Sequence, residues 1–191
     1  MPHHAVFLDR DGTINHDTGY LKNPEDVIIL NGVTEGIRKL KQDFGFKIVV
    51  ISNQAGVAKG LMTIEDVENV NCKIDLLLRQ DGAEIDKYYY CPYHPDFSSK
   101  EESKCRKPSP LMIYKAVEEL DLDLSRSYMI GDREADVLCG FNANIKTILL
   151  KSEIYGDQLT ALLNQNKKPN FVAANFIEAC DFIIKDFGGI N

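Results

Sequence analysis

Short apolar runs that end in small polar residues constrain the fold of this chain more than any other feature. Three of them, Ala5–Leu8, Lys47–Ile51 and Tyr128–Ile130, are typical of strands buried inside a sheet. Between them lie segments with helical spacing of apolar residues, such as 33–44 and 64–78. Strands that alternate with helices predict a parallel sheet covered by helices on both faces.

The rest of the chain continues this alternation. We expect strands at 85–91 and 147–150 and helices at 110–120 and about 134–141. The end of the chain predicts a helix, a short strand at 171–172, a second helix and a glycine tail. Because no repeat, low-complexity tract or linker interrupts the pattern, we expect all 191 residues to form one α/β domain.

The charge of the chain argues against polyanionic macromolecules as partners. It has 22 Lys and Arg against 29 Asp and Glu, a net charge of −7, whereas nucleic-acid and anionic-membrane binders need a dominant basic face. No apolar run approaches the roughly 20 residues of a transmembrane helix. Residues 1–4 lack the features of a signal peptide. We therefore expect no nucleic-acid or membrane partner. We also expect a cytoplasmic protein and, by default, a monomer.

The five cysteines are odd in number and include no Cys-x-x-Cys pair. Thiols stay reduced in a cytoplasm, so we expect free thiols throughout the chain. Cys72, Cys139 and Cys180 lie in helical patterns, and we expect each to be a small buried residue.

Polar residues after three of the strands predict the place of a site. They occupy 9–13, 52–54 and 131–136. Because the carboxyl ends of parallel strands share one edge of the sheet, where ligands bind in such folds, we expect these segments to meet in one crevice.

Three carboxylates in that crevice, those of Asp9, Asp11 and Asp132, would repel one another unless a cation neutralised them. Oxygen ligands favour Mg²⁺, and a carboxylate-bound Mg²⁺ attracts phosphate. The hydroxyl of Ser52 and the ammonium of Lys107 suit phosphoryl oxygens. The set therefore predicts Mg²⁺-dependent chemistry on a phosphate group.

Each motif alone has a simpler explanation. The Asp-x-Asp-Gly-Thr at 9–13 is also typical of an Asx turn, and the Gly-Asp at 131–132 of a helix cap. Ser52 and Asn53 alone fit an ordinary loop, and Arg106 and Lys107 alone fit solvated loop charges. Their combination at strand ends, in this order, favours one shared site.

The motifs resemble those of the haloacid dehalogenase superfamily of phosphohydrolases. The resemblance covers about residues 5–150 and is closest to the group of D-glycero-D-manno-heptose 1,7-bisphosphate phosphatases and histidinol-phosphatases. The matching segments are 7–15, 19–21, 52–60, 89–92, 105–108 and 123–132. The resemblance implies a Rossmann-like parallel sheet without a large cap domain, since the segments between its motifs are too short for one.

The resemblance also assigns roles. Asp9 matches the nucleophile that forms an aspartyl-phosphate, and Asp11 matches the general acid and base. Ser52 and Lys107 match the groups that hold and neutralise the transferring phosphoryl. The carboxylates of Asp9 and Asp132 and the main-chain carbonyl of Asp11 match the Mg²⁺ ligands.

The family pattern implies a small phosphorylated sugar as substrate, most closely heptose 1,7-bisphosphate cleaved at its 7-phosphate. Arg106 and Arg133 suit a second phosphate, because guanidinium groups pair well with phosphate oxygens. The candidate substrate-binding residues are Asp17, Thr18, Gly19, Tyr20, Ser52, Asn53, Gln54, Ala55, Arg106, Lys107 and Arg133.

One loop departs from the family pattern. Many members of the group hold a structural zinc on a Cys-x-His and a Cys-x-Cys, which correspond here to Cys91, Tyr93, Ser103 and Cys105. Neutral hydroxyls are poor zinc ligands, so we expect no zinc, although the adjacent His94 would allow a three-ligand site. A Cys91–Cys105 disulfide is also not expected in a reducing compartment.

Other functions stay open at this stage. A histidinol-phosphate phosphatase or a broad sugar-phosphate phosphatase would share every catalytic motif. A catalytically silent sugar-phosphate-binding protein would be expected to lack Asp9 or Asp11, and both are present. A 3′-phosphatase acting on nucleic-acid ends has similar motifs, but the net charge of −7 disfavours it.

Overall fold

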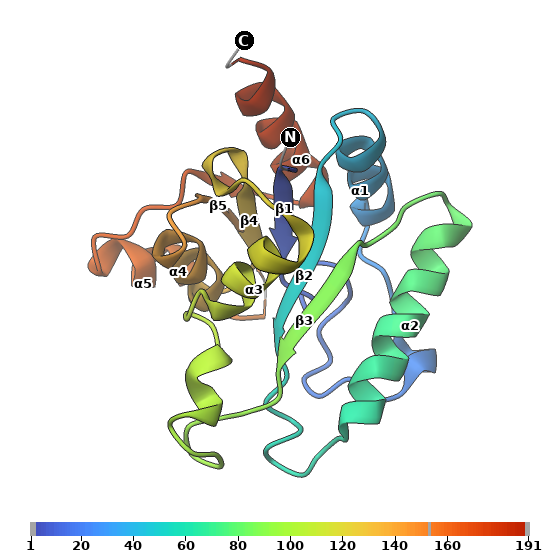
Figure 1. Ribbon diagram of the computed structural model, residues 1–191, viewed down its shortest axis with the longest axis vertical. Helices are drawn as coiled ribbons and strands as arrows, with labels where there is room; N and C mark the ends of the chain where they lie inside the picture. The colour runs from blue at the N-terminus through green and yellow to red at the C-terminus, as the bar shows by residue number, and fades with distance from the viewer. Residues whose placement is uncertain (1–2, 153, 190–191) are drawn as a thin grey trace.

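The computed structural model describes residues 3–152 and 154–189 and contains a six-stranded sheet (Figure 1). The strands are β1 (Ala5–Leu8), β2 (Lys47–Asn53), β3 (Lys87–Cys91), β4 (Tyr128–Gly131), β5 (Lys146–Leu150) and β6 (Phe171–Ala173). They lie in the order β3-β2-β1-β4-β5-β6, and every neighbouring pair is parallel. The predicted parallel α/β sheet is confirmed.

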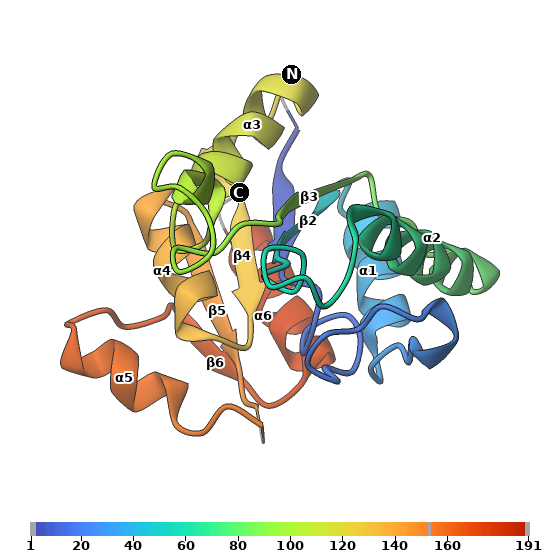
Figure 2. The same cartoon turned by 90° about the horizontal axis from the view of Figure 1, so that it is seen from below.

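Helices cover both faces of this sheet (Figures 1 and 2). The α-helices are α1 (Val33–Gln42), α2 (Ile64–Gln80), α3 (Leu111–Leu120), α4 (Glu134–Asn142), α5 (Gln158–Asn164) and α6 (Phe176–Gly188). Three 3₁₀ helices that we did not predict are η1 (Pro24–Asp26), η2 (Glu102–Cys105) and η3 (Leu124–Arg126). Large insertions that could form a cap domain are absent from the described residues, as expected.

The sheet separates two apolar layers. Val6 and Leu8 of β1 pack into the layer that α1, α2 and α6 complete, whereas Ala5 and Phe7 pack into the layer of α3 and α4. Successive side chains of a strand point to opposite faces, so a strand buried on both sides must be apolar throughout. All four residues of β1 are fully buried, which explains its continuous apolar run.

From β1 the chain adds strands toward one edge of the sheet, and from β4 it adds them toward the other edge. This reversal between the neighbouring strands β1 and β4 fixes the place of the site. The connection after β1 runs through α1 on one face, and the connection after β4 runs through α4 on the other. Loops that leave neighbouring strands toward opposite faces open a crevice between them, at the carboxyl edge of the sheet. Figure 2 views the molecule from the side where the loops after β1, β2 and β3 lie.

Several element boundaries differ from the prediction. β3 begins at Lys87 and not at 85. The Asp86 main-chain N–H donates to the Ile48 carbonyl, but the Ile48 N–H donates to the Asp86 carboxylate and not to a main-chain carbonyl, so regular strand pairing begins only after Asp86. The tail predicted at Gly188 belongs instead to the last turn of α6, and Gly189 caps it. The expectation that residues 1–4 lack a signal peptide concerns in part residues 1 and 2, which lie outside the described residues.

Two predictions about cysteines are wrong. Cys72 is exposed on α2, because Val70, Asn71 and Ile74 lie on the buried face of that helix and Cys72 lies on the other. Cys139 and Cys180 are buried, as expected. Cys91 and Cys105 form a disulfide, since the end of β3 and η2 hold their Cα atoms 5.6 Å apart. That spacing is within the range that disulfides span. The absence of zinc from this loop stays a prediction.

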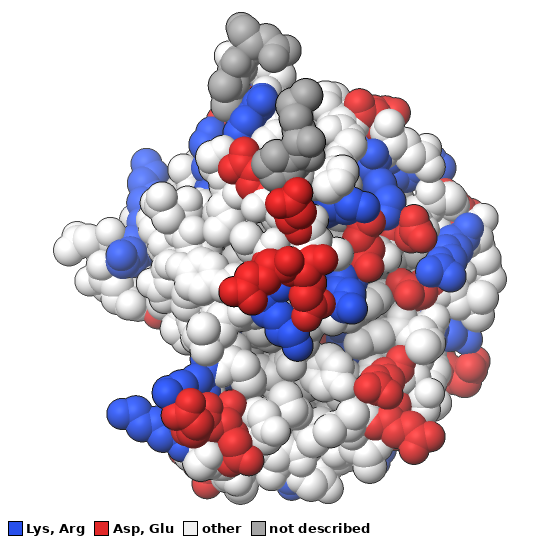
Figure 3. Space-filling view, in the orientation of Figure 1, with Lys and Arg blue, Asp and Glu red and all other residues white. Residues whose placement is uncertain are grey.

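The surface carries charges of both signs. On the face shown in Figure 3, acidic and basic side chains are interspersed, and the basic ones form no continuous stripe among the described residues of that face. Within residues 3–152 and 154–189, no helix has the length and apolar character needed to span a bilayer.

The disulfide predicts the number of titratable thiols. Of the five cysteines, three are free in the structure, so the unfolded but unreduced protein should react with about three equivalents of a thiol reagent. After reduction the count should rise to five. A count of five before reduction would show that Cys91 and Cys105 are not paired, and the Cys91→Ser, Cys105→Ser double variant is the matched control.

Candidate active site

The carboxyl ends of β1, β2 and β4 border a cavity of about 400 Å³. The predicted site residues that line it are Asp9, Asp11, Asp17, Gly19, Tyr20, Ser52, Asn53, Gln54, Ala55, Arg106, Lys107 and Arg133. Asp132 lies against the floor beside Asp9, while Thr18 is exposed and does not line the cavity. The structure therefore brings together almost the whole predicted set.

Other residues of the cavity were missed. They are Gly56, Lys59, His94, Ala135, Asp136 and Tyr155. Asp136 had a usable signal, because it ends the polar segment 131–136 that follows the predicted strand at 128–130. Tyr155 follows β5 in a segment with no motif, so no local pattern pointed to it.

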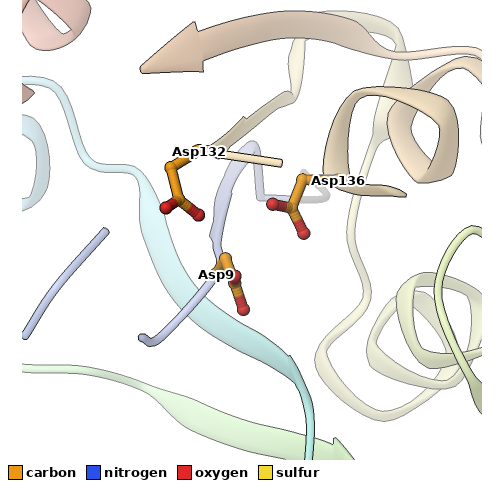
Figure 4. Close-up of side chains that lie close together, drawn as sticks. All are labelled: Asp9, Asp132 and Asp136. Atoms are coloured by element: carbon orange, nitrogen blue, oxygen red, sulfur yellow. The ribbon is translucent and has the colours of Figure 1, made fainter. Parts of the chain in front are cut away.

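Three carboxylates lie close together at this edge of the sheet (Figure 4), and two of them, Asp9 and Asp136, line the floor of the cavity. Asp9 follows β1, Asp132 follows β4 and Asp136 lies in the first turn of α4; one ligand atom from each lies within 4.8 Å of the others. All three residues are buried. Our prediction named Asp11 as the third carboxylate of this cluster, but the side chain in that place is Asp136.

Two glycines make room for this cluster. A Cβ on Gly12 would lie 2.3 Å from the Asp132 carboxylate, and a Cβ on Gly131 would lie 2.3 Å from the Asp136 side chain. Gly12 also has φ +84, a left-handed conformation that L side chains rarely adopt. The glycines of both motifs are therefore needed for close approach of the carboxylates.

Lys107 neutralises part of the cluster. Its ammonium lies 2.7 Å from Asp9 Oδ1 and 2.6 Å from Asp136 Oδ1, and it donates to the main-chain carbonyl of Ile51 at 2.8 Å. Burial favours the neutral amine, but the charges of Asp136 and Asp9 outweigh it and raise the pKa of Lys107. All three ammonium protons therefore have acceptors, and the side chain holds one position.

The hydrogen bonds of the cluster show where a cation fits. Asp136 accepts from Lys107 at one oxygen and from the main-chain N–H of Arg133 at the other, at 3.0 Å. Both oxygens of Asp132 are buried without a hydrogen-bond partner among the described residues. Buried carboxylate oxygens need a partner, and a hard cation such as Mg²⁺ supplies one. The donor set beside Asp9 and Asp132 therefore fits Mg²⁺.

The same crowding shifts the acidity of these groups. Burial, together with the charge of Asp136, raises the pKa of Asp9 to about 6, although Lys107 opposes the shift. Burial and the charges of Asp9 and Asp136 raise the pKa of Asp132 to about 8. Asp132 is thus the group whose ionisation depends most on a nearby cation.

Asp11 has the opposite environment. Arg10 lies 3.0 Å from its carboxylate, and Asn15 and Gln54 donate to it at 3.0 and 2.8 Å. Burial alone would raise the pKa of Asp11, but the Arg10 charge and these hydrogen bonds outweigh it and lower the pKa. Arg10 is itself almost fully buried and donates to Asn71 of α2, which fixes it.

The segment after β2 connects the other parts of the cavity. Asn53 receives a hydrogen bond from the Lys107 main-chain N–H at 2.9 Å and donates to the Lys107 carbonyl at 3.1 Å. Gln54 donates to the Ser52 hydroxyl at 2.7 Å. The strand end therefore positions the loop that carries Lys107, and it orients Ser52 toward the floor of the cavity.

Two arginines give the rim a positive charge. Burial and the nearby Arg133 charge lower the pKa of Arg106, and Arg106 Nη1 is buried without a hydrogen-bond partner among the described residues. Arg133 Nη2 lies 2.8 Å from Asp17, and its guanidinium lies over the Tyr155 ring. The cavity thus has Lys107 at its floor and Arg106 and Arg133 at its rim, and Lys59 lines it as well.

The chain is similar in sequence to known proteins. The HAD-hydrolase-like family model matches residues 104–179. A D-glycero-D-manno-heptose-1,7-bisphosphate 7-phosphatase of Chlorobaculum tepidum is 40% identical over 92% of this chain and 91% of its own length. The D-glycero-beta-D-manno-heptose-1,7-bisphosphate 7-phosphatase of Escherichia coli is 40% identical over 76% of this chain and 78% of its own.

A solved structure is similar as well. The D,D-heptose 1,7-bisphosphate phosphatase from B. bronchiseptica, crystallised with magnesium and phosphate, superposes with a TM-score of 0.82. It is 26% identical, and the match covers 96% of this chain and 99% of that one.

The fold and the comparisons define a phosphatase of the haloacid dehalogenase type, as the motifs predicted. Within that class, the chain belongs to the family of D-glycero-D-manno-heptose-1,7-bisphosphate 7-phosphatases.

Gly131→Ala should disturb the site without unfolding the protein. The added Cβ would displace Asp136 from Lys107, and misplacement by about 1 Å costs on the order of 10²-fold in rate. We expect kcat/KM for phosphate release to fall by at least about 10-fold. Gly188→Ala is the control, because a Cβ there has no neighbour within 4 Å. Equal kinetics for both variants would contradict the close approach.

The raised pKa values predict how stability depends on pH. The pKa values of Asp9 and Asp132, about 6 and about 8, lie above the ordinary value of 3.8. The folded state therefore binds more protons than the unfolded state in this range, and the free energy of unfolding of the metal-free protein should fall as pH rises from about 5 to about 9. Thermal denaturation with a chelator measures this fall, and added Mg²⁺ should reduce it.

Asp132→Asn separates this effect from other titrations. The amide has no charge to bury, so the fall with pH should be smaller and Mg²⁺ should no longer stabilise the protein at about pH 9. The same pH profile and the same response to Mg²⁺ in both proteins would show that Asp132 is not the group concerned.

Proposed function

We propose that this chain is a Mg²⁺-dependent phosphatase that removes the 7-phosphate of D-glycero-D-manno-heptose 1,7-bisphosphate. The observation that carries the proposal is the pair of cationic sites in one cavity, Lys107 at the floor and Arg106 with Arg133 at the rim. A substrate with two phosphates can use both. The activity named for the relatives supports the same substrate.

In the first step, the Asp9 carboxylate attacks phosphorus. Lys107 holds Asp9 Oδ1 at 2.7 Å, so its other oxygen is the one to form the new O–P bond. The bond between phosphorus and the sugar oxygen breaks, and Asp11 gives that oxygen a proton. The products are the heptose 1-phosphate with a free 7-hydroxyl group and an aspartyl-phosphate on Asp9.

For this step Asp11 must first take up a proton. In the structure Arg10, Asn15 and Gln54 hold it as a carboxylate. The negative charge of an incoming phosphate raises the pKa of a nearby carboxyl group, so substrate binding itself favours the protonated form. Asp11 thereby changes from a base in the free enzyme to an acid in the complex.

In the second step, a water molecule attacks the same phosphorus and Asp11 accepts its proton. The O–P bond to Asp9 breaks, which releases inorganic phosphate and restores the carboxylate. The environment of Asp11 suits this half of the reaction, because its hydrogen bonds favour the charged form once the sugar product has left.

The carboxylates of Asp9 and Asp132 and the main-chain carbonyl of Asp11 would hold the Mg²⁺ ion. When bound, the ion neutralises charge on the phosphoryl oxygens and lowers the repulsion that Asp9 would otherwise meet. Ser52 contributes its hydroxyl, and Lys107 contributes its positive charge to the transferring group. The ion pair of Asp136 with Lys107, at 2.6 Å, helps to keep the ammonium in place beside Asp9.

We also propose that the chain acts as a monomeric single domain in the cytoplasm, with no zinc in the Cys91–Cys105 loop. In a reducing cytoplasm the two cysteines that are paired in the structure would be thiols. Tyr93 and Ser103, at the other two positions of the zinc pattern in that loop, offer only neutral hydroxyls, which are poor zinc ligands.

Phosphate release with Mg²⁺ tests the proposed function. We expect kcat/KM for heptose 1,7-bisphosphate to exceed that for histidinol phosphate by about 10²-fold, because only the bisphosphate reaches the rim arginines. Lys107→Ala should lower the rate on the order of 10²-fold, as for other lost charge stabilisers. Asp9→Asn should abolish turnover.

The controls separate the parts of this proposal. Equal or reversed preference would contradict the bisphosphate assignment and leave a histidinol-phosphate or broad-range phosphatase. Appreciable turnover by Asp9→Asn would remove Asp9 as the nucleophile, and near-normal kinetics for Lys107→Ala would place that loop outside the site.

A further inference from the structure

Tyr155 reaches the cavity from a part of the chain that carries no family motif. It lies in the segment between β5 and α5, about twenty residues after Arg133, and it lines the rim. No step of the proposed mechanism uses it.

Three side chains form a closed arrangement at this rim. The guanidinium of Arg133 lies over the Tyr155 ring, 3.7 Å from its centroid. The Tyr155 hydroxyl donates to Asp17 Oδ2, which also accepts from Arg133 Nη2 at 2.8 Å. Asp17 Oδ1 accepts from the Gly19 main-chain N–H at 2.7 Å, so Asp17 is itself fixed.

The main chain of Tyr155 is anchored to the site as well. Gln158 donates to the Tyr155 carbonyl at 2.6 Å and accepts from the Glu134 main-chain N–H at 2.9 Å. Glu134 is the first residue of α4, next to Arg133. The tyrosine and the arginine are therefore attached to the same helix start.

Arg133 and Asp17 differ in exposure, and the exposed one, Arg133, can contact a ligand. The Asp17 side chain is 2% exposed, whereas the Arg133 side chain is 43% exposed. Arg133 has five N–H donors, and its hydrogen bond to Asp17 uses Nη2 alone. The remaining donors stay available for an anion that enters the cavity.

From these contacts we propose that Tyr155 is a positioning residue that holds Arg133 in the orientation that binds the remote phosphate of the substrate. The inference rests on the proposed function and names a specificity determinant within it. A long half-exposed side chain loses rotamer freedom when it binds a ligand, and an aromatic ring beneath the guanidinium removes part of that cost beforehand.

The test compares two substrates that differ in the remote phosphate. Heptose 1,7-bisphosphate has one, and p-nitrophenyl phosphate does not. Tyr155→Ala should raise KM for the bisphosphate by about 10-fold, as expected for the loss of a stacked cation, with kcat changed by less than about twofold. For p-nitrophenyl phosphate, kcat/KM should change by less than about twofold.

Two further variants make the test specific. Tyr155→Phe keeps the ring and loses only the hydroxyl bonded to Asp17, so KM for the bisphosphate should rise by only about two- to threefold. In an Arg133→Ala background, Tyr155→Ala should have no further effect on KM. Tyr114→Ala is the matched control, because Tyr114 is a half-exposed tyrosine away from the cavity.

The outcomes distinguish the two proposals. If the wild-type enzyme prefers the bisphosphate but Tyr155→Ala lowers kcat/KM equally for both substrates, the proposed role of Tyr155 is wrong and the proposed function stands. A further rise in KM in the Arg133→Ala background overturns the role of Tyr155 too. A wild-type enzyme with no preference for the bisphosphate overturns the proposed function and, with it, the role of Tyr155.

Discussion

The ion pairs of Lys107 are the interaction on which the rest of the site depends. One ammonium bridges Asp9, which follows β1 in the middle of the sheet, and Asp136 in the first turn of α4, which packs on one face of that sheet. Breaking a buried ion pair leaves an unpaired charge at a cost of several kcal/mol, about 3–5 in measured cases. Several features keep the Lys107 ammonium in place: the hydrogen bonds of Asn53 to the Lys107 loop, and the two glycines that let the carboxylates approach.

The sequence was sufficient to predict the sheet and most of the site, for a physical reason. A parallel sheet is buried on both faces, so strands such as 5–8 and 47–51 appear as continuous apolar runs. Its ligands bind where those runs end, which makes Asp9, Ser52 and Asp132 neighbours without any knowledge of side-chain packing.

What the sequence did not predict depends on packing between distant segments. Asp136 replaces Asp11 in the carboxylate cluster because α4 turns its first residues toward Lys107, while Arg10 holds Asp11 aside. The Cys91–Cys105 disulfide follows from the path of a polar loop, and Tyr155 from the return of the chain after β5. No periodicity or motif encodes the disulfide or the approach of Tyr155, whereas Asp136 lies within the polar segment 131–136 that the sequence pattern does mark.

The cavity also explains how a chain with a net charge of −7 can bind a substrate with two phosphates. Net charge governs long-range attraction, but binding depends on the charges within a few ångströms, because solvent ions screen the rest over about 8–10 Å. At the floor, an excess of carboxylates requires a cation before phosphate can approach. At the rim, Arg106 and Arg133 face the cavity with most of their donors unused. On the proposed function, the floor binds the metal-bound phosphoryl group and the rim binds the remote phosphate, so a substrate with two phosphates uses both parts of the cavity.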